Sequence, residues 1–297
     1  MCDILDMITI IKQEELETIG KIKSNSLIQG DCLQVMKDIE DKSIDMIITS
    51  PPYDQMRIYT NETRWDFKIF KVIANEIYRI IKDGGVVVWI VNDQTIKGSE
   101  SGTSFRQALY FKDIGFNLET MIWEKTGSGC LGSNKFYAQN FEYMFILSKG
   151  YPKTINLIHD RENVKKDGFV STSGNIKANG SKTYRKIKRK PYGKRTNIWR
   201  ITQQQKINHP APFPEQLVCD HIKTWSNKND IILDPFAGSF TTCIVCVKLR
   251  RNFIGIEISE KYCKIGLDRL HACGVTPQYI NWDIQNYYIL SNILGVI

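Results

Sequence analysis

Short apolar runs alternate with amphipathic segments along most of the chain. The run from Val86 to Val91 is continuously apolar, which is typical of a buried strand in a parallel sheet. Apolar side chains recur every three or four residues over 66–82, which predicts an amphipathic helix closed by Asp83-Gly84-Gly85. Strands that alternate with helices indicate an α/β fold, a doubly wound and mostly parallel sheet with helices on both faces. Such sheets bind ligands at the carboxyl ends of their strands.

The same patterns predict the other elements. Strands are expected over 27–29, 44–49, 118–124, 143–147, 231–233 and 253–256, and helices over 32–39, 105–114, 214–225, 239–249 and 260–272. The tail over 278–297 is apolar and aromatic, and its pattern assigns it no role. Between residues 150 and 206 the regular pattern breaks into Gly, Ser, Asn, Lys and Arg, so we expect one domain over 1–150 and 206–297 with an insertion over 151–205.

The positive charge of the chain is concentrated in this insertion. The whole chain carries 40 Lys and Arg against 32 Asp and Glu, a net charge of +8. All of this excess lies in one acid-free run made of Lys182, Arg185, Lys186, Lys188, Arg189, Lys190, Lys194 and Arg195. Aromatic residues and glycines are interspersed with the cations, which suits a segment that follows nucleic-acid phosphates. A solvated surface loop has the same composition.

Composition also limits the class of protein. No apolar run approaches the roughly 20 residues that a membrane span requires. The segment Met1 to Lys12 lacks a basic leader and a cleavage pattern, so we expect a cytoplasmic protein without a membrane partner. Cys243 and Cys246 have metal-like spacing, but they lie in a run that predicts a buried helix. We therefore expect reduced, buried thiols and no metal site.

The first candidate site is the turn after the strand predicted over 231–233. The segment 234–242, DPFAGSFTT, is rich in small residues that let backbone amides approach a ligand. It matches neither the phosphate-binding GxxxxGK[ST] pattern nor GxGxxG. Glu257 ends the next strand, where a carboxylate can accept hydrogen bonds from both ribose hydroxyls. A nucleoside without phosphates fits best; the structural alternative is a helix-capping Asp234 beside a surface Glu257.

The second candidate site is the motif Ser50-Pro51-Pro52-Tyr53, which also follows a predicted strand. Consecutive prolines lack amide hydrogens and have fixed φ, so the Ser50 side chain and the Pro51 carbonyl can be held as two acceptors for an amino group. The ring of Tyr53 offers a face on which a planar base could stack. A proline-rich turn with Tyr53 in the core is the structural alternative.

These motifs jointly resemble those of the amino-methylating DNA methyltransferases that use S-adenosylmethionine. That family carries a D-P-F-x-G-S-G-T-T cofactor motif, an acidic residue that ends the next strand, and a [DNS]-P-P-[YF] catalytic motif. Further counterparts are GDCL at 30–33, DGG at 83–85, NIW at 197–199 and HPAPFP at 209–214. The order of catalytic motif, basic insertion and cofactor motif is that of the β class. One departure is Phe240, where the family usually has Gly.

The resemblance implies a Rossmann-like methyltransferase fold, with a catalytic domain over 1–150 and 206–297 and a target-recognition insertion over 151–205. It implies transfer of a methyl group from S-adenosylmethionine to the exocyclic amino group of a base flipped out of double-stranded DNA. It leaves open a cognate restriction endonuclease that acts on the same site. A Ser at position 50, where adenine enzymes usually have Asp or Asn, favours N4 of cytosine; N6 of adenine is the alternative.

The resemblance also implies roles for single residues. Ser50, Pro51, Pro52 and Tyr53 would be catalytic, and the basic run from Lys182 to Arg195 would contact DNA. The cofactor would be bound by Asp31, Pro210, Asp234, Phe236, Gly238, Ser239, Thr241 and Glu257. Among these, Asp31 would bind the adenine amino group, Glu257 the ribose, and Phe236 and Pro210 would pack against the cofactor.

Other classes of protein fit less well. A nicotinamide-dependent oxidoreductase would need GxGxxG and would leave the Ser-Pro-Pro-Tyr motif unexplained. A nucleic-acid-binding module without activity would account for the basic run alone. RNA or protein amides remain open as substrates of the same chemistry.

Overall fold

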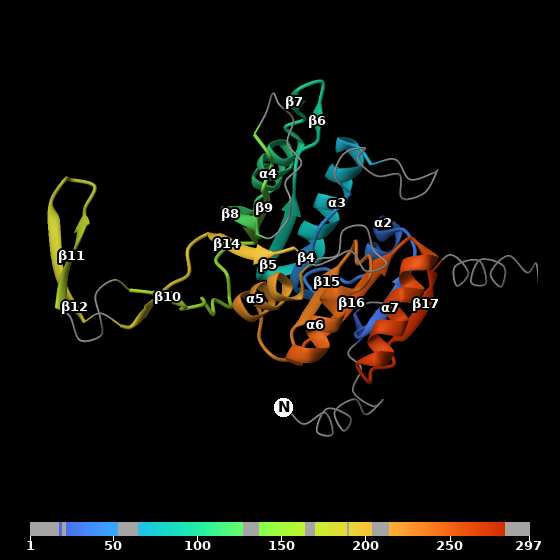
Figure 1. Ribbon diagram of the computed structural model, residues 1–297. Coiled ribbons are helices and arrows are strands. Elements are labelled where there is room, and N and C mark those ends of the chain that lie inside the picture. The colour runs from blue at the N-terminus through green and yellow to red at the C-terminus, as the bar shows by residue number, and fades with distance from the viewer. Residues whose placement is uncertain are drawn as a thin grey trace, which may run out of the picture.

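The computed structural model describes residues 18–19, 22–52, 65–126, 137–163, 170–188, 190–203 and 214–282 (Figure 1). Its centre is a nine-stranded sheet with the strand order β14-β8-β9-β5-β4-β15-β16-β3-β17. The strands are β3 (Ser26–Gln29), β4 (Ile44–Thr49), β5 (Ile81–Val91), β8 (Asn117–Thr126), β9 (Phe141–Ser148), β14 (Ile198–Thr202), β15 (Ile231–Asp234), β16 (Asn252–Glu257) and β17 (Gln278–Asn281). In this sheet β9 runs antiparallel to both of its neighbours, and the other pairs are parallel.

Helices cover both faces of the sheet. They are α2 (Cys32–Met36), α3 (Phe67–Ile80), α4 (Thr103–Asp113), α5 (Glu215–Trp225), α6 (Thr241–Leu249) and α7 (Glu260–Ala272). Alternate side chains of β5 point to opposite faces: Val87 and Trp89 pack with α2, α3 and α4, whereas Val86 and Val88 pack with α5, α6 and α7. The predicted doubly wound, mostly parallel sheet is confirmed, and the described part of the chain contains no helix long and apolar enough to cross a membrane.

Most element boundaries agree with the sequence prediction within a few residues, but the end of α3 does not. The helix ends at Ile80 and β5 starts at Ile81, so the Asp83-Gly84-Gly85 segment lies inside the strand rather than after the helix. The Lys149 amino group donates hydrogen bonds to the carbonyls of Tyr78 and Ile81, at 2.6 and 3.2 Å. A side chain that follows β9 thus satisfies the carbonyls at this junction, which local sequence does not reveal.

Two edge strands were not predicted. β17 pairs in parallel with β3, so the start of the tail completes one edge of the sheet. Trp282 follows β17 and packs on the backbone of Gly30, where an added Cβ would lie 2.8 Å from the Trp282 Cβ. At the other edge, β14 pairs in parallel with β8, so residues 198–202 belong to the sheet although the predicted insertion runs to 205.

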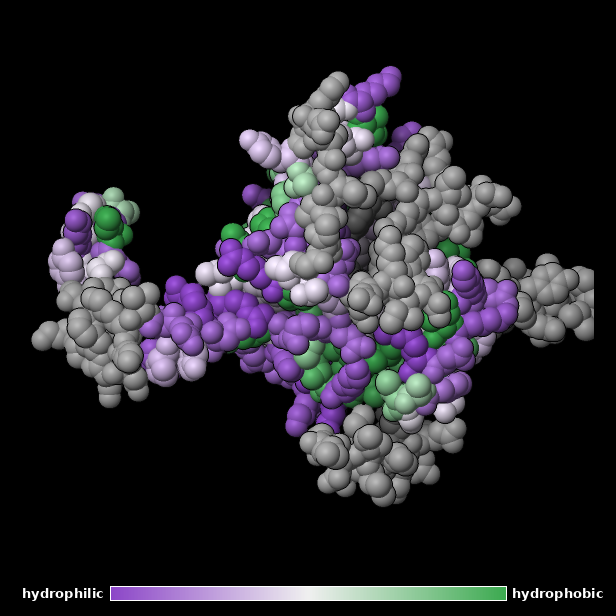
Figure 2. Space-filling view, viewed as in Figure 1, coloured by the Kyte–Doolittle hydropathy of each residue, from purple (hydrophilic) through white to green (hydrophobic). Residues whose placement is uncertain are grey.

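Residues 161–163, 170–188 and 190–193 of the insertion form an arm that projects from the sheet (Figure 1), whereas the start of the insertion lies against α5, where the Asn156 amide donates to the Thr224 carbonyl at 2.8 Å. Its neck is a short antiparallel pair of β10 (Arg161–Glu162) and β13 (Tyr192–Gly193), and its head is a hairpin of β11 (Val170–Ile176) and β12 (Lys182–Lys188). Figure 2 shows mainly hydrophilic side chains along the neck of this arm. Two further short pairs also lie outside the main sheet: β1 (Thr18–Ile19) with β2 (Ile22–Lys23), and β6 (Thr95–Ile96) with β7 (Ser99–Glu100).

Candidate active site

The carboxyl ends of four neighbouring parallel strands bring the predicted motifs to one edge of the sheet. Ser50 follows β4, Asp234 ends β15, Glu257 ends β16, and Asp31 follows β3. These strands are adjacent in the order β4-β15-β16-β3, so segments far apart in the sequence become neighbours. This edge is where an open α/β sheet binds its ligands.

Asp234 holds two of these motifs together. Its Oδ1 accepts hydrogen bonds from the Thr49 hydroxyl at 2.7 Å and from the Phe236 backbone amide at 3.1 Å, and its Oδ2 accepts one from the Thr242 hydroxyl at 2.6 Å. The residue is 1% exposed. Both carboxylate oxygens therefore bind the protein, and Asp234 positions the turn that follows β15.

Burial raises the pKa of Asp234 to about 6, although its three hydrogen bonds act in the opposite direction. The Asp234 carboxylate should therefore take up a proton as the pH falls through about 6. Asp234 joins the end of β4, which directly precedes Ser50, to the turn between β15 and α6.

Glu257 holds the same turn from the neighbouring strand. Its Oε2 accepts a hydrogen bond from the Gly238 amide at 2.9 Å, and its Oε1 accepts one from the Ser259 amide, also at 2.9 Å. Desolvation raises the pKa of this carboxyl, while the two amides oppose that rise. A carboxylate oxygen can accept more than one hydrogen bond, so Glu257 retains the capacity to bind hydroxyl groups of a ligand.

Asp31 lies next to Glu257 because the Gly30 amide donates to the Glu257 carbonyl at 3.0 Å. Asp31 is the N-cap of α2: its Oδ1 accepts hydrogen bonds from the amides of Leu33 and Gln34, at 2.9 and 3.2 Å. Its Oδ2 has no hydrogen-bond partner among the described residues. A cap that leaves one oxygen unused suits the predicted contact with an amino group.

Phe236 is half-buried in the turn and contacts two tryptophans. Its ring packs edge-on against Trp65 at 5.5 Å and against Trp89 at 6.4 Å between ring centroids. Trp65 was not predicted as a site residue, because one tryptophan before an amphipathic helix gives no motif. Trp89 is fully buried and supports the Phe236 ring from the core, whereas Trp65 and Phe236 are half-buried and offer apolar rings on which a planar group could pack.

The hydroxyls of Ser239 and Thr241 are directed to Arg269 on α7. The Arg269 Nη1 atom donates to the Ser239 carbonyl at 2.6 Å and to the Ser239 and Thr241 hydroxyls, each at 3.0 Å. These hydrogen bonds join the turn to α7. Sequence reasoning missed Arg269 because a single basic residue in the last turn of a helix is common.

Phe240 adopts the left-handed conformation, with φ of 61°, which explains why glycine is usual at this position of the family motif. Its ring is buried between Gly255 and Gly266. An added Cβ would lie 2.7 Å from the ring at Gly255 and 2.2 Å from it at Gly266. Two glycines thus provide the space that lets this chain carry phenylalanine without displacing the turn.

The acceptor motif begins directly after the Thr49 hydroxyl that donates to Asp234. Ser50 and Pro52 are half-buried, and Pro51 is buried. Tyr53, Pro210 and Arg189 lie outside the described residues. Cys243 and Cys246 are buried in α6, as predicted, and the described residues contain no group of three or more His, Cys, Asp or Glu side chains able to hold a metal ion.

Arg195 differs from the other cations of the basic run. Its Nη1 atom lies 2.6 Å from Asp220 Oδ2 of α5, its Nε donates to Asp160 at 2.8 Å, and its guanidinium lies 5.0 Å from the centroid of the Trp199 ring. These contacts join the root of the arm to the sheet domain. Arg195 thus fixes the arm to α5, whereas Lys182, Lys190 and Lys194 are exposed.

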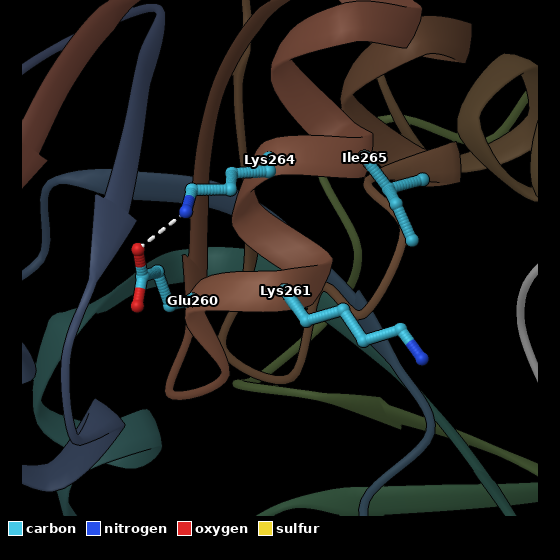
Figure 3. Close-up of a pocket in the computed structure, with 4 residues that line it drawn as sticks. All are labelled: Glu260, Lys261, Lys264 and Ile265. Atoms are coloured by element: carbon cyan, nitrogen blue, oxygen red, sulfur yellow. Dashed lines mark ion pairs between the residues drawn. The ribbon is translucent and has the colours of Figure 1, made fainter.

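A separate open hollow of about 550 Å³ lies on the outer face of α7 (Figure 3). It is lined by Glu260, Lys261, Lys264 and Ile265, and a 2.6 Å ion pair joins Glu260 to Lys264. None of the residues of the strand-end motifs lines it.

The raised pKa of Asp234 makes a prediction for stability. The folded protein holds this proton more tightly than the unfolded chain, whose carboxyl has the ordinary value of 3.8. The carboxyl thus favours the fold below about pH 4, and that contribution is lost as the pH rises through about 6. Relative to Asp234→Asn, the wild type should lose about 2 to 3 kcal/mol of unfolding free energy between pH 4 and 7.

Urea denaturation of both proteins at several pH values measures this difference. The exposed Asp268→Asn variant on α7 is the control and should follow the wild type. A difference between wild type and Asp234→Asn that stays constant over this range would contradict the assignment.

Sequence comparison identifies relatives along most of the chain. A family model described as DNA methylase (N6_N4_Mtase) matches residues 44–268. This range includes the Ser50-Pro51-Pro52-Tyr53 motif (the acceptor motif), the arm, and the turn over 234–242 (the cofactor turn). Orphan methyltransferase M.BamHII of Bacillus amyloliquefaciens is 48% identical over 246 residues, 79% of this chain and 91% of that protein. DNA adenine methyltransferase YhdJ of Escherichia coli is 30% identical over 266 residues, 84% of this chain and 83% of that protein.

Solved structures share the fold. The PvuII DNA methyltransferase (cytosine-N4-specific) superimposes with a TM-score of 0.61 at 20% identity, over 85% of this chain and 90% of that one. A putative DNA modification methylase of Thermus thermophilus, complexed with S-adenosyl-L-methionine, gives a TM-score of 0.60 at 19% identity, over 86% and 98% of the two chains. From its motifs, its sheet and these relatives, the chain belongs to the DNA methylase family, the S-adenosylmethionine-dependent enzymes that methylate amino groups of DNA bases.

Proposed function

We propose that this protein transfers a methyl group from S-adenosylmethionine to the exocyclic N4 amino group of cytosine in double-stranded DNA. The observation that carries the proposal is the hydrogen bond from Thr49 to Asp234, at 2.7 Å. It joins the strand that ends in the Ser50-Pro51 acceptor pair to the turn that would hold the methyl donor. Acceptor and donor segments on one rigid edge can hold two reactants in a fixed geometry.

The residues at the strand ends fit an uncharged nucleoside joined to an amino acid. The Asp31 Oδ2 atom would accept a hydrogen bond from the adenine amino group, and Glu257 would bind the ribose hydroxyls. Phe236 would pack against the adenine or methionine part, and the small residues around Gly238 would bring the backbone close to the ligand. Asp234, Ser239 and Thr241 would act indirectly, because their side chains bind Thr49, Thr242 and Arg269.

The acceptor pair addresses the poor reactivity of the target atom. The lone pair of a base amino nitrogen is delocalised into the ring, so the nitrogen is a weak nucleophile. The Ser50 hydroxyl and the Pro51 carbonyl would accept the two amino hydrogens and favour a pyramidal nitrogen whose lone pair points away from the ring. S-adenosylmethionine supplies the electrophilic methyl group on its sulfonium. Positioning and electrostatics then lower the barrier without a covalent nucleophile.

Ser50 supports cytosine as the target. A hydroxyl is shorter, uncharged and weaker as an acceptor than a carboxylate, so Ser50 would hold an amino nitrogen differently from the Asp found in many adenine enzymes. Both chemistries occur among the similar proteins: the PvuII enzyme is named cytosine-N4-specific, and YhdJ is named an adenine methyltransferase. N6 of adenine is therefore the alternative.

The arm would recognise the DNA target. The side chains of the basic run other than Arg195 would contact phosphates: Lys182, Arg185, Lys186, Lys188, Arg189, Lys190 and Lys194. Such contacts strengthen binding to any DNA sequence and depend on salt. Arg195 would keep the arm fixed to α5 through Asp220. A cognate restriction endonuclease that cuts the same site is a further proposed partner; M.BamHII, in contrast, is named an orphan methyltransferase.

Glu257→Gln tests the cofactor site. Removing the negative charge weakens the hydrogen bonds that the ribose hydroxyls would donate, so binding of S-adenosylmethionine should weaken by about 1.5 to 3 kcal/mol. Isothermal titration calorimetry measures the affinity, and the melting temperature confirms folding. Glu260→Gln is the control, because this exposed carboxylate three residues later pairs with Lys264 instead of the turn. Equal affinity in Glu257→Gln and wild type would remove the carboxylate from the site.

Nucleoside analysis tests the base. The purified protein and S-adenosylmethionine are incubated with unmethylated plasmid, and the digested DNA is analysed by mass spectrometry. We expect N4-methylcytosine, and we expect Ser50→Ala to form it more slowly because one acceptor is lost. N6-methyladenine without N4-methylcytosine would contradict the choice of base and leave the acceptor mechanism intact, whereas no methylated base would contradict the mechanism as well.

A further inference from the structure

The hairpin of β11 and β12 is a free two-stranded ribbon. Seven residue pairs join the two strands, from Val170 with Lys188 to Ile176 with Lys182, and within the described residues the hairpin forms a sheet of its own. Figure 1 shows it at the far end of the arm, away from the nine-stranded sheet. The residues of the ribbon whose side chains are described, 174–176 and 182–184, are all exposed. A two-stranded hairpin is only marginally stable alone, so such a ribbon is suited to being completed by a partner.

The two faces of the ribbon differ in chemistry. Opposed residues of an antiparallel pair lie on the same face, and the next pair lies on the other. Ile176 with Lys182 and Gly174 with Tyr184 define one face, here called the lysine face; Thr172 with Lys186 and Val170 with Lys188 continue it by register. Asn175 with Thr183 defines the other, here called the amide face; Ser173 with Arg185 and Ser171 with Ile187 continue it by register.

An aromatic ring occupies the middle of the lysine face. Tyr184 lies over Gly174, where an added Cβ would be 3.3 Å from two of its ring atoms. Tyr184 is 68% exposed and Ile176 is 71% exposed, so apolar groups on this face are in contact with solvent. On the amide face, the Thr183 hydroxyl makes a long hydrogen bond of 3.4 Å to the Asn175 carbonyl, and the Asn175 and Thr183 residues are exposed.

Charge identifies the class of partner. The segment 170–195 carries nine Lys and Arg and no Asp or Glu. Of these cations, Arg195 alone is assigned above to ion pairs with the sheet domain. A ribbon with this excess of positive charge is complementary to a polyanion. Since the chain belongs to a family that acts on DNA, the partner is a DNA duplex.

We propose that this ribbon enters the major groove of DNA with its amide face toward the base edges, and that the lysine face supplies contacts to the flanking phosphates. The proposal rests on the proposed function and names the surface that would select the target sequence. In this proposal, Asn175 and Thr183 belong to the surface that contacts base edges, and Lys182 belongs to the surface that contacts phosphates.

The dimensions and residue types support this orientation. The major groove is about 12 Å wide and admits a two-stranded ribbon, whose strands lie about 4.8 Å apart. Asparagine can bond adenine through two hydrogen bonds, and serine and threonine bond either base. These types lie at the register positions of the amide face. Lysines, which bind phosphates without reading sequence, lie at register positions of the opposite face, and a long lysine side chain can reach around the edge of a ribbon.

Two cross-strand double variants one register step apart test the proposal. Asn175→Ala/Thr183→Ala alters the amide face, and Ile176→Ala/Lys182→Ala alters the lysine face. Sequencing of methylated genomic DNA first defines the wild-type target. Each variant is then assayed for methylation at that target and at sites with one mismatch, and for the dependence of DNA binding on salt. Unchanged affinity for S-adenosylmethionine shows that each variant is folded.

The amide-face variant should lose discrimination by about tenfold or more, with an unchanged salt slope. The lysine-face variant should bind all DNA more weakly and reduce the salt slope by about one, with discrimination retained. Discrimination that is retained in the amide-face variant, or lost in the lysine-face variant, would overturn the proposal.

The outcome separates this inference from the proposed function. Wild-type protein that methylates no DNA contradicts the proposed function itself. Wild-type protein that methylates a defined target, with equal discrimination in both double variants, contradicts only the role of the ribbon.

Discussion

The buried carboxylate of Asp234 is the contact on which the candidate active site depends. It accepts hydrogen bonds from the last residue of β4, from the turn after β15 and from the second residue of α6. Burying a carboxylate costs free energy of folding unless hydrogen bonds satisfy its oxygens. Loss of any of these three donors would therefore destabilise the buried Asp234 side chain. The acceptor motif at Ser50 and the cofactor turn are thereby fixed in one arrangement, although 183 residues separate their first members in the sequence.

Other residues hold the turn from its remaining sides. Glu257 binds the Gly238 amide, and Arg269 binds Ser239 and Thr241 from α7. The surface left for a ligand therefore consists largely of backbone, the Phe236 ring and carboxylate oxygens at Asp31 and Glu257. In this arrangement the hydrogen bonds to Glu257 and Arg269 hold the turn in place, and other atoms would contact a ligand. The arm has a similar division, because Arg195 fixes its root to α5 while Lys182, Lys190 and Lys194 are exposed.

The sheet and the two strand-end motifs could be predicted because apolar runs and small-residue turns are local signals. What could not be predicted depends on contacts between distant segments. The end of α3 is stabilised by Lys149, which follows a later strand. The strands β14 and β17 are short edge strands whose pairing partners lie far away in the sequence. The sequence alone does not distinguish Arg195 from the other cations of the basic run, because its ion pairs with Asp160 and Asp220 depend on the fold. The hydrogen bond from Arg269 to the Ser239 hydroxyl likewise joins segments that are 30 residues apart, so the local sequence does not reveal it.

The most direct measurement of the central claim is the single-turnover rate of methyl transfer in Thr49→Val and Thr49→Ser. Valine keeps the shape of this buried residue and removes the donor to Asp234, whereas serine keeps the hydroxyl. If Asp234 positions the acceptor pair against the methyl donor, Thr49→Val should slow transfer by about ten- to a hundredfold with a much smaller change in S-adenosylmethionine affinity, and Thr49→Ser should retain most of the rate. A Thr49→Val enzyme as fast as the wild type, or a Thr49→Ser enzyme as slow as Thr49→Val, would contradict the account.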